Sequence, residues 1–491
     1  MRILNTLTRK KEELAPLTPG HVRMYVCGVT VYDLSHIGHA RSAIVFDVLR
    51  RYLLFKGYRV TFVRNFTDVD DRIIRRANAD GVAAREISER YIAEFQVDMA
   101  SLGVLTGDAE PKATDHIPQM ITLVERLITG GFAYVVDGDV YFEVRTFPEY
   151  GKLSGKNLEE LLAGARVEVD ERKRDPRDFA LWKSAKPGEP SWASPWGPGR
   201  PGWHIECSAM SMQYLGESFD IHGGGEDLVF PHHECEIAQS EAATKRPFVK
   251  LWVHNGYVNL AAEKMSKSLG NTLAIKEFVK RHDPEAIRLW MLGTHYRSPV
   301  EYAEDRVREA ARGLARFRAL IDEAERLAPR SAGSRYGVSI GPGDVEAIVA
   351  EITDPELSRT VATRARAFSA AMDDDCNTPA ALAALFDLSR DLHRYRDAMS
   401  RGAQSADAFV LGVDVLLRLG QRGLGLFERA ATVKGPSEEA RSAAERLVAE
   451  REDARARREY RRADELRARV QALGATIIDT ASGPQLKWDG P

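Results

Sequence analysis

Two short segments of the sequence carry side chains suited to binding phosphate groups. The first is residues 36–39, with the sequence HIGH, and the second is residues 264–268, with the sequence KMSKS. A helix that begins near His39 would present free backbone N–H groups and its positive dipole end to a phosphate, with both imidazoles aimed at the same oxygens. Lysines in a mobile loop could bring ammonium groups over a leaving pyrophosphate. Together the motifs predict activation of a carboxylate by ATP, with His36, His39, Lys264 and Lys267 as catalytic residues.

Each motif also has a simpler interpretation. The two histidines could merely cap a helix, and the lysines could belong to a solvated loop. The joint occurrence of both motifs in one α/β context favours the catalytic interpretation. Such a reaction needs no general base, because the attacking carboxylate is already ionised near neutral pH. Catalysis would then consist of positioning and charge stabilisation.

The elements around the histidines form a predicted β-α-β unit. Residues 22–27 indicate a strand, apolar residues from Ile44 to Leu53 recur at helical spacing, and residues 60–63 indicate a second strand. Ligands of parallel sheets bind beyond the carboxyl ends of the strands. This edge would hold Cys27, the paired histidines and residues 65–68, and we expect the active site there.

The pattern changes between residues 116 and 202. A hairpin is predicted where residues 134–136 and 140–142 flank a turn around Gly138, and we interpret this region as an insertion that splits the sheet. The α/β pattern resumes with a helix over 204–215, a strand over 219–222, a helix from about Pro231 and a strand over 250–254. Helical periodicity follows after residue 300, interrupted by linker-like stretches at 329–344 and 434–437.

Composition bounds the class of protein. A chain of 491 residues, with 44% hydrophobic and 29% charged residues, predicts a multidomain globular protein. The net charge of −3 argues against a uniformly basic nucleic-acid coat. Four dispersed cysteines favour a reducing compartment, and neither a signal peptide nor a transmembrane segment is evident. We expect a cytoplasmic protein that does not enter a membrane.

The HIGH and KMSKS segments resemble the signatures of class I aminoacyl-tRNA synthetases. Residues 28–39 and 202–210 (GWHIECSAM) resemble the cysteinyl-tRNA synthetases of that class, and the likeness extends over nearly the whole chain. It implies an α/β fold: a Rossmann-like parallel-sheet catalytic domain split by an insertion, then an α-helical bundle and a small C-terminal anticodon-binding domain. The expected segments are a catalytic first half (1–115), a connective insertion (116–202), a catalytic second half (203–254), a stem-contact region with the KMSKS loop (255–315), the bundle (316–432) and the anticodon domain (433–491).

The resemblance also implies substrates and their contacts. It implies a ligase that converts L-cysteine and ATP, with Mg²⁺, to cysteinyl-adenylate and pyrophosphate, and then transfers cysteine to tRNA(Cys). ATP would contact Gly38, His39, Lys267 and the glycines Gly223, Gly224 and Gly225. The cysteine pocket would be formed by Gly28, Thr67, Trp203, His204, His222 and His233. No long heptad seam is evident, and we expect a monomer.

Four residues form a predicted zinc site. Cys27 ends a strand, Cys207 lies on a predicted helix, and His232 and Glu236 lie four apart on one helical face, a donor set suited to Zn²⁺. Taken singly, each is more often an ordinary buried residue, but the resemblance implies one zinc ion per chain at these positions. Zinc would select the substrate thiolate over the hydroxyl of serine, which makes editing unnecessary. Cys235 stands where the family has asparagine, and it could compete with Glu236, which we favour.

The C-terminal region is expected to bind RNA. Residues 441–470 contain ten arginines and seven acidic residues along predicted helices. Such a face is usually only solvated, although it could follow RNA phosphates. By resemblance the anticodon is recognised here, and Trp488 could stack on an unpaired base, though terminal tryptophans more often pack.

Two other functions fit parts of the sequence. A cysteine ligase of thiol biosynthesis would share the adenylate chemistry and the zinc pocket, but it would not need residues 316–491. A non-catalytic relative that binds tRNA or senses cysteine would not need His36, His39, Lys264 and Lys267, which are all present.

Overall fold

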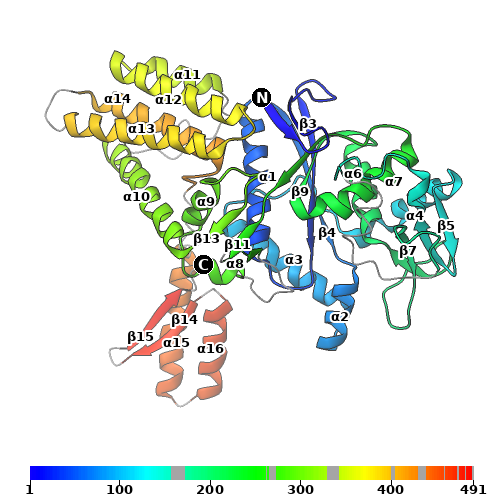
Figure 1. The fold of residues 1–491 in the computed structure, drawn as a ribbon. Helices are drawn as coiled ribbons and strands as arrows, with labels where there is room; N and C mark the ends of the chain where they lie inside the picture. Colours follow the sequence, from blue (N-terminus) through cyan, green and yellow to red (C-terminus); the bar gives the residue numbers. More distant parts are fainter. Residues whose placement is uncertain are drawn as a thin grey trace. The chain divides into compact units, whose positions relative to one another are not determined.

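The computed structural model describes most of the chain. The described residues are 1–155, 172–260, 263–264, 273–328, 342–399, 404–428, 438–457, 459–472, 475–480 and 483–488. They form two compact units, residues 1–427 and residues 428–491 (Figure 1). Each unit is described separately below.

The first unit is built on a four-stranded sheet in which every neighbouring pair of strands is parallel. Its order is β10-β9-β3-β4, so that the two strands before the insertion lie beside the two strands after it. Strands buried on both faces of a parallel sheet are rich in apolar residues, as the sequence of β3 is. The predicted α/β fold with a split parallel sheet is confirmed. The strand bounds are β3 (His21–Thr30), β4 (Arg59–Thr67), β9 (Phe219–Gly225) and β10 (Val249–Asn255).

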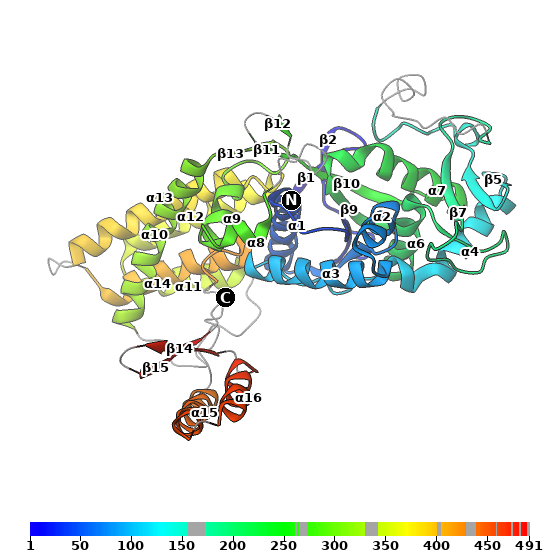
Figure 2. The ribbon, with the colours of Figure 1, turned by 90° about the horizontal axis from the view of Figure 1, so that it is seen from below.

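Two buried cores lie on opposite faces of this sheet. Leu251 and Val253 of β10 face one core, whereas Trp252 between them faces the other, as strand alternation requires. Helix α1 (Ile37–Phe55) packs in the first core and α6 (Trp203–Leu215) in the second. Figures 1 and 2 show α1 between the sheet and the helices α10 to α14, with α6 and α7 on the side of the insertion.

The insertion contains a separate antiparallel sheet with the order β5-β6-β7-β8. Its first two strands form the predicted hairpin, and the turn residues Asp137 and Gly138 have φ angles of 51° and 86°. Positive φ at both central positions is typical of two-residue hairpin turns. The bounds are α4 (Ile117–Thr129), β5 (Ala133–Val136), β6 (Asp139–Phe142), β7 (Phe179–Ser184) and β8 (Gly199–Pro201).

The predicted helix from about Pro231 begins later than expected. Phe230 has extended backbone angles (φ −139°, ψ 132°) inside an irregular turn over Val229–His233, and regular helix α7 (Glu234–Thr244) follows it. The extended residue interrupts the helical hydrogen-bond pattern, so His232 lies just before the helix that carries Glu236.

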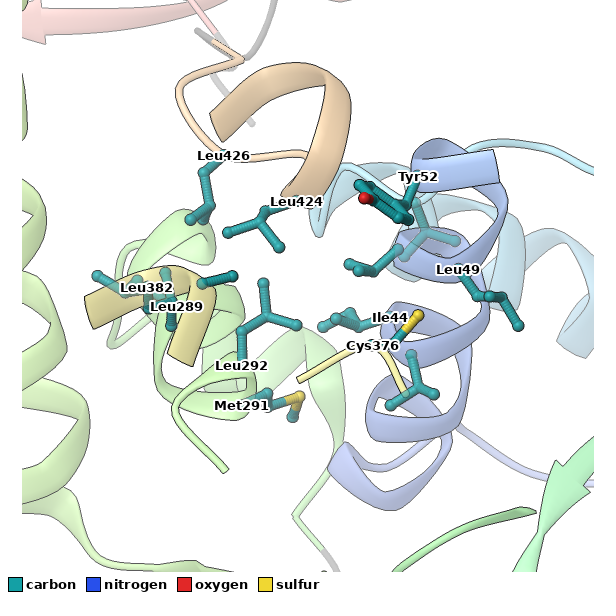
Figure 3. Close-up of a cluster of buried hydrophobic side chains, with 14 of the residues drawn as sticks. Ile44, Leu49, Tyr52, Leu289, Met291, Leu292, Cys376, Leu382, Leu424 and Leu426 are labelled. Carbon is teal, nitrogen blue, oxygen red and sulfur yellow. The ribbon is translucent and has the colours of Figure 1, made fainter. Parts of the chain in front are cut away.

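Short strands and helices connect the sheet to the bundle. Strand β11 pairs with β12 in antiparallel and with β13 in parallel orientation, and α1 and α9 share a buried cluster with the bundle (Figure 3). The bounds are β1 (Arg2–Asn5), β2 (Lys10–Glu13), α2 (Asp71–Asp80), α3 (Ala84–Ser101), β11 (Val258–Leu260), β12 (Glu263–Lys264), α8 (Ile275–Val279), α9 (Pro284–Leu292) and β13 (Val300–Tyr302). Those of the bundle are α10 (Glu304–Leu327), α11 (Pro342–Glu351), α12 (Pro355–Asp373), α13 (Thr378–Met399) and α14 (Ala406–Arg418).

The second unit is a helix pair with a two-stranded antiparallel sheet. Leu447, Ala463, Leu466 and Val470 form its small apolar core between the helices. The bounds are α15 (Glu438–Ala456), α16 (Tyr460–Ala472), β14 (Ala475–Thr480) and β15 (Gly483–Trp488). Among the described residues of both units, no helix has the length and apolarity needed to cross a membrane.

Candidate active site and metal centre

The two histidines of the HIGH segment form the N-terminus of α1. His36 is the N-cap residue, and its Nδ1 accepts a hydrogen bond from the Gly38 N–H at 3.1 Å. His39 Nδ1 accepts from the His36 N–H at 3.3 Å, and the two rings stack with centroids 3.8 Å apart. Because each Nδ1 is an acceptor, the proton of a neutral ring lies on Nε2. Both imidazoles therefore present an Nε2–H donor at a helix N-terminus, the arrangement that suits a phosphate oxygen.

The four predicted zinc ligands come together in the folded chain. Their donor atoms, from Cys27, Cys207, His232 and Glu236, all lie within 4.8 Å of one another. A second cluster meets the same distance limit. It shares Cys27 and Glu236 with the first, but contains His222 and His233 in place of Cys207 and His232. Both clusters sit at the carboxyl end of β3, where the sequence predicts the active site.

The distances in the first cluster fit a tetrahedral metal. Cys27 Sγ lies 3.6 Å from Cys207 Sγ and 3.4 Å from Glu236 Oε1, and Glu236 Oε1 lies 3.0 Å from His232 Nε2. Zinc–sulfur bonds of about 2.3 Å in tetrahedral geometry separate two sulfurs by roughly 3.8 Å, and mixed donor pairs by somewhat less. These four residues thus fit a zinc ion without rearrangement of the backbone.

Neighbouring side chains support the first cluster better than the second. His204 Nδ1 lies 3.0 Å from Nδ1 of His232, and His222 Nε2 lies 2.9 Å from Oε2 of Glu236. The ligands His232 and Glu236 are thus each held through the side-chain atom that would not bind the metal. Such outer contacts orient metal ligands in proteins. In the second cluster His222 would be a ligand, yet its Nδ1 is buried and has no hydrogen-bond partner in the described structure.

The pKa values of three donor groups show how charge is distributed in this site. Burial acts to lower the pKa of His232, but Glu236 and Cys207 raise it to about 10. Burial acts to raise the pKa of Glu236, but His222 and His232 lower it to about 2. For Cys207, burial opposes ionisation, yet hydrogen bonding from Cys27 and the nearby His232 lower its pKa to about 6. Buried negative charge of this kind favours a cation.

Cys235 does not belong to either donor cluster. Its sulfur lies 3.2 Å from the Tyr150 hydroxyl in the insertion, and burial raises the pKa of its thiol. Helix geometry separates it from its neighbour, because adjacent residues of α7 point in directions about 100° apart. Glu236 thus faces the cluster and Cys235 faces away from it.

Four of the six predicted cysteine-pocket residues contact the donor cluster, namely Trp203, His204, His222 and His233. The Trp203 ring stacks on the His232 ring with centroids 4.3 Å apart, and His233 Nε2 lies 3.3 Å from Cys27 Sγ. Gly28 allows close packing of β3 on β4, because a Cβ at this position would lie 1.6 Å from the Asn65 carbonyl oxygen. Thr67 donates to Glu206 at 2.9 Å.

Sequence reasoning assigned no role to Asn65 and Glu206. Asn65 Oδ1 accepts the Gly28 N–H at 2.8 Å and lies 3.8 Å from Cys207 Sγ. Burial raises the pKa of Glu206 well above its usual range. Asn65 lies in residues 65–68, which the strand pattern places at the sheet edge, and Glu206 lies in residues 202–210, which carry the family resemblance. These two positions were the available signal.

Several predicted contacts are only partly described. Gly223 to Gly225 end β9, and a Cβ at Gly223 would lie 2.2 Å from the Phe46 ring, so packing against α1 requires glycine there. Of the KMSKS segment, the backbone of Lys264 pairs with Asn259 in the β11–β12 ladder, while Lys267 lies outside the described residues. The backbone of Trp488 belongs to β15 and its side chain lies outside the described part, as does most of the 329–344 linker.

Comparison with known families identifies two regions of the chain. Residues 13–312 match the family of tRNA synthetases class I (C), catalytic domain, and residues 367–428 match the DALR domain family. The second match covers the bundle from the end of α12 onward and stops where the second unit begins.

Full-length relatives agree with this assignment, and a solved structure shares the fold. The chain is 51% identical to the cysteine–tRNA ligase of Geobacter sulfurreducens, over 99% of each chain. It is 50% identical to the cysteine–tRNA ligase of Syntrophobacter fumaroxidans, over 98% of each chain. Its fold resembles Mycobacterium tuberculosis methionyl-tRNA synthetase, with TM-score 0.60, 16% identity and coverage of 86% of this chain and 96% of that one. The chain belongs to the class I tRNA synthetase (C) family.

Proposed function

We propose that this protein is a cysteine–tRNA ligase. It activates L-cysteine with ATP to cysteinyl-adenylate and pyrophosphate, and then transfers cysteine to the 3′ end of tRNA(Cys). The observation that carries the proposal is the donor cluster of Cys27, Cys207, His232 and Glu236, in which all members except the half-buried Cys27 are buried, in a chain that also carries the HIGH helix. Relatives about 50% identical over nearly the whole chain carry the same name.

The donor cluster supports a role in selecting the amino acid. Bound zinc would supply a coordination position at which a thiol loses its proton, which a hydroxyl does far less readily. The residues of the chain hold this position in place: His204 orients His232, and His222 orients Glu236. Because the Trp203 ring covers His232, the cluster is shielded from bulk water on that side.

The HIGH helix supports the activation step. The substrate carboxylate attacks the α-phosphorus, the bond from that phosphorus to the bridging oxygen breaks, and pyrophosphate leaves with its electrons. His36 and His39 donate Nε2–H hydrogen bonds to phosphate oxygens as charge moves onto the pyrophosphate. Lys264 and Lys267 add positive charge to the same leaving group, and Gly38 with Gly223 to Gly225 line the nucleotide position.

Other aspects of the function belong to the same proposal. Mg²⁺ accompanies ATP, the protein acts as a cytoplasmic monomer, and the C-terminal unit contacts the anticodon, with Trp488 stacking on a base. Support for the RNA contact comes from the arginine-rich helices of this unit, where the Arg461 side chain is 97% exposed. Phosphate contacts of this kind weaken as salt rises.

Two assays test the proposal together. Purified protein should exchange labelled pyrophosphate into ATP only when L-cysteine is present, and should then charge tRNA(Cys). Absence of exchange would rule out both enzymes that activate cysteine, the tRNA ligase and the cysteine ligase of thiol biosynthesis. Exchange without charging of tRNA would indicate a cysteine ligase with another acceptor, such as an amino sugar.

A further inference from the structure

Three consecutive aspartates, residues 373–375, lie where α12 ends and the turn to α13 begins. Asp375 and the following Cys376 both have left-handed backbone conformations, with φ angles of 67° and 46°. Residues other than glycine adopt this region only where surrounding contacts enforce it, and such positions concentrate at functional sites. The side-chain contacts of the three aspartates show which parts of the first unit impose this conformation.

The first two aspartates contact helix α1 and the β1–β2 hairpin. Asp373 accepts hydrogen bonds from the Tyr52 hydroxyl at 2.9 Å and from Lys56 Nζ at 3.1 Å, both at the end of α1. Asp374 forms ion pairs of 2.9 and 3.0 Å with two basic side chains of the β1–β2 hairpin, and its own side chain is 42% exposed. Exposed ion pairs of this type contribute little free energy.

Asp375 differs because its carboxylate is completely buried. Its Oδ1 accepts the Leu4 N–H at 2.8 Å and the Tyr296 hydroxyl at 2.7 Å, and its Oδ2 accepts from Arg297 Nε at 2.8 Å. Hydrogen bonds to a charged acceptor are the stronger kind, and burial protects them from competing water. The carboxylate thus fixes the segment 295–297, which joins α9 to β13.

This segment supports the strands that lead to the lysine motif. The Gly256 N–H donates to the Tyr296 carbonyl oxygen at 2.9 Å, and a Cβ on Gly256 would lie 2.7 Å from the Ser298 carbonyl carbon. The backbone at Gly256 is therefore in direct contact with the backbone of residues 296–298. Beyond Gly256, β11 pairs with β13 and with β12, where Asn259 is opposite Lys264.

The HIGH helix holds the same segment from the other side. Arg41, two residues after His39, is buried and donates to the carbonyl oxygens of Met291 (2.5 Å), Thr294 (3.1 Å) and His295 (2.9 Å). Figure 3 shows Met291 and Leu292 beside Ile44 of α1, with Cys376 from the aspartate turn in the same buried cluster. Residues 291–297 thus lie between the HIGH helix and the aspartate turn.

We propose that Asp375 is a positioning residue for adenylate formation. By fixing residues 295–297, it sets where β12, and with it Lys264, lies relative to His36 and His39. The inference rests on the proposed function, in which these side chains act on the triphosphate. Misplacement of a catalytic group by about 1 Å can reduce a rate about 100-fold. The loss should appear in kcat and leave the KM for cysteine unchanged, because Asp375 acts through the position of Lys264, which stabilises the transition state, and not on the cysteine pocket.

Cysteine-dependent pyrophosphate exchange by the full chain provides the test. In Asp375→Asn an amide NH₂ replaces one accepting oxygen, and we expect kcat to fall at least tenfold while the KM for cysteine stays within twofold. Asp374→Asn is the matched control one residue earlier, and both constants should stay within twofold. Tyr296→Phe removes a single donor to Asp375, and kcat should fall about threefold.

Two results would overturn the inference. One is a folded Asp375→Asn or Tyr296→Phe protein whose kcat stays within twofold of wild type. The other is a rise of the KM for cysteine that matches the fall in kcat, which would indicate general loosening of the catalytic unit. If Asp375→Asn does not fold, Tyr296→Phe decides alone. Absence of exchange in the wild-type protein would refute the proposed function itself, and is thereby distinguishable from both results.

Discussion

Replacement of Glu236 and Cys235 in turn distinguishes the two candidates for the fourth metal ligand. Glu236 Oε1 lies within 3.4 Å of both Cys27 Sγ and His232 Nε2, so Glu236→Ala removes a donor from the centre of the cluster. Loss of a residue that only orients a ligand lowers metal affinity about 10- to 100-fold. Loss of the ligand itself should therefore lower zinc affinity more than about 100-fold.

Cys235→Ala should lower the stability of the protein and leave its zinc affinity unchanged. The variant leaves the buried Tyr150 hydroxyl without the sulfur that lies 3.2 Å away, which costs about 1–3 kcal/mol of stability. Its zinc affinity should remain within threefold of wild type. Glu234→Ala is a matched control, because this buried carboxylate binds the Leu153 and Ser154 N–H groups instead of the cluster.

Two measurements separate these effects. Competition with a chromophoric chelator gives zinc affinity, and urea denaturation gives the free energy of unfolding. The reasoning is refuted if Glu236→Ala keeps wild-type zinc affinity while Cys235→Ala loses it. That result would mean that α7 is rotated in solution relative to the structure described above.

Three further predictions concern the HIGH helix, the sheet and a buried carboxyl group. His36→Asn keeps a side chain that can cap α1 but removes the imidazole, so pyrophosphate exchange should fall about 100-fold while the free energy of unfolding changes by less than about 1 kcal/mol; retained exchange would mean that His36 is only a cap. Gly28→Ala should destabilise the first unit by at least about 3 kcal/mol in urea, because its Cβ would overlap the Asn65 carbonyl oxygen, whereas Gly343→Ala, with nothing within 4 Å, should be neutral or stabilising. Burial, with a neighbouring glutamate, raises the pKa of Asp98 to about 6. The stability that its protonated form provides is present below the unfolded pKa of about 4 and is lost as pH rises through about 6. Asp98→Asn should therefore unfold at higher temperature than wild type at pH 7.5 and not at pH 4, and an equal effect at both pH values would contradict the assignment.

Local sequence patterns were sufficient for much of the fold. Apolar runs over residues 22–27 and 60–63, with a helical repeat between them, predicted the β-α-β unit, because strand and helix periods are set by the backbone alone. The same patterns predicted the hairpin around Gly138 and the resumption of the sheet after the insertion. Residues 36–39 were placed correctly at the start of α1 for the same reason.

The metal cluster depended on information of a different kind. Cys27, Cys207 and His232 come from segments as much as 205 residues apart, and no local pattern brings such residues together. Resemblance to a family supplied that set. The sequence could not choose between Cys235 and Glu236, because residues three and four positions from His232 share one side of a helix.

The tertiary structure decided what the sequence left open. It directed Cys235 toward Tyr150 and Glu236 toward the cluster, because the packing of α7 between the sheet and the insertion fixes the rotation of the helix. It also showed that Asp375 reaches Tyr296, a contact across 79 residues that depends on how the bundle packs on α1. Sequence by itself determined the secondary-structure elements of this protein and the residues whose side chains can bind a metal or a phosphate. Only long-range packing determined which of those residues meet.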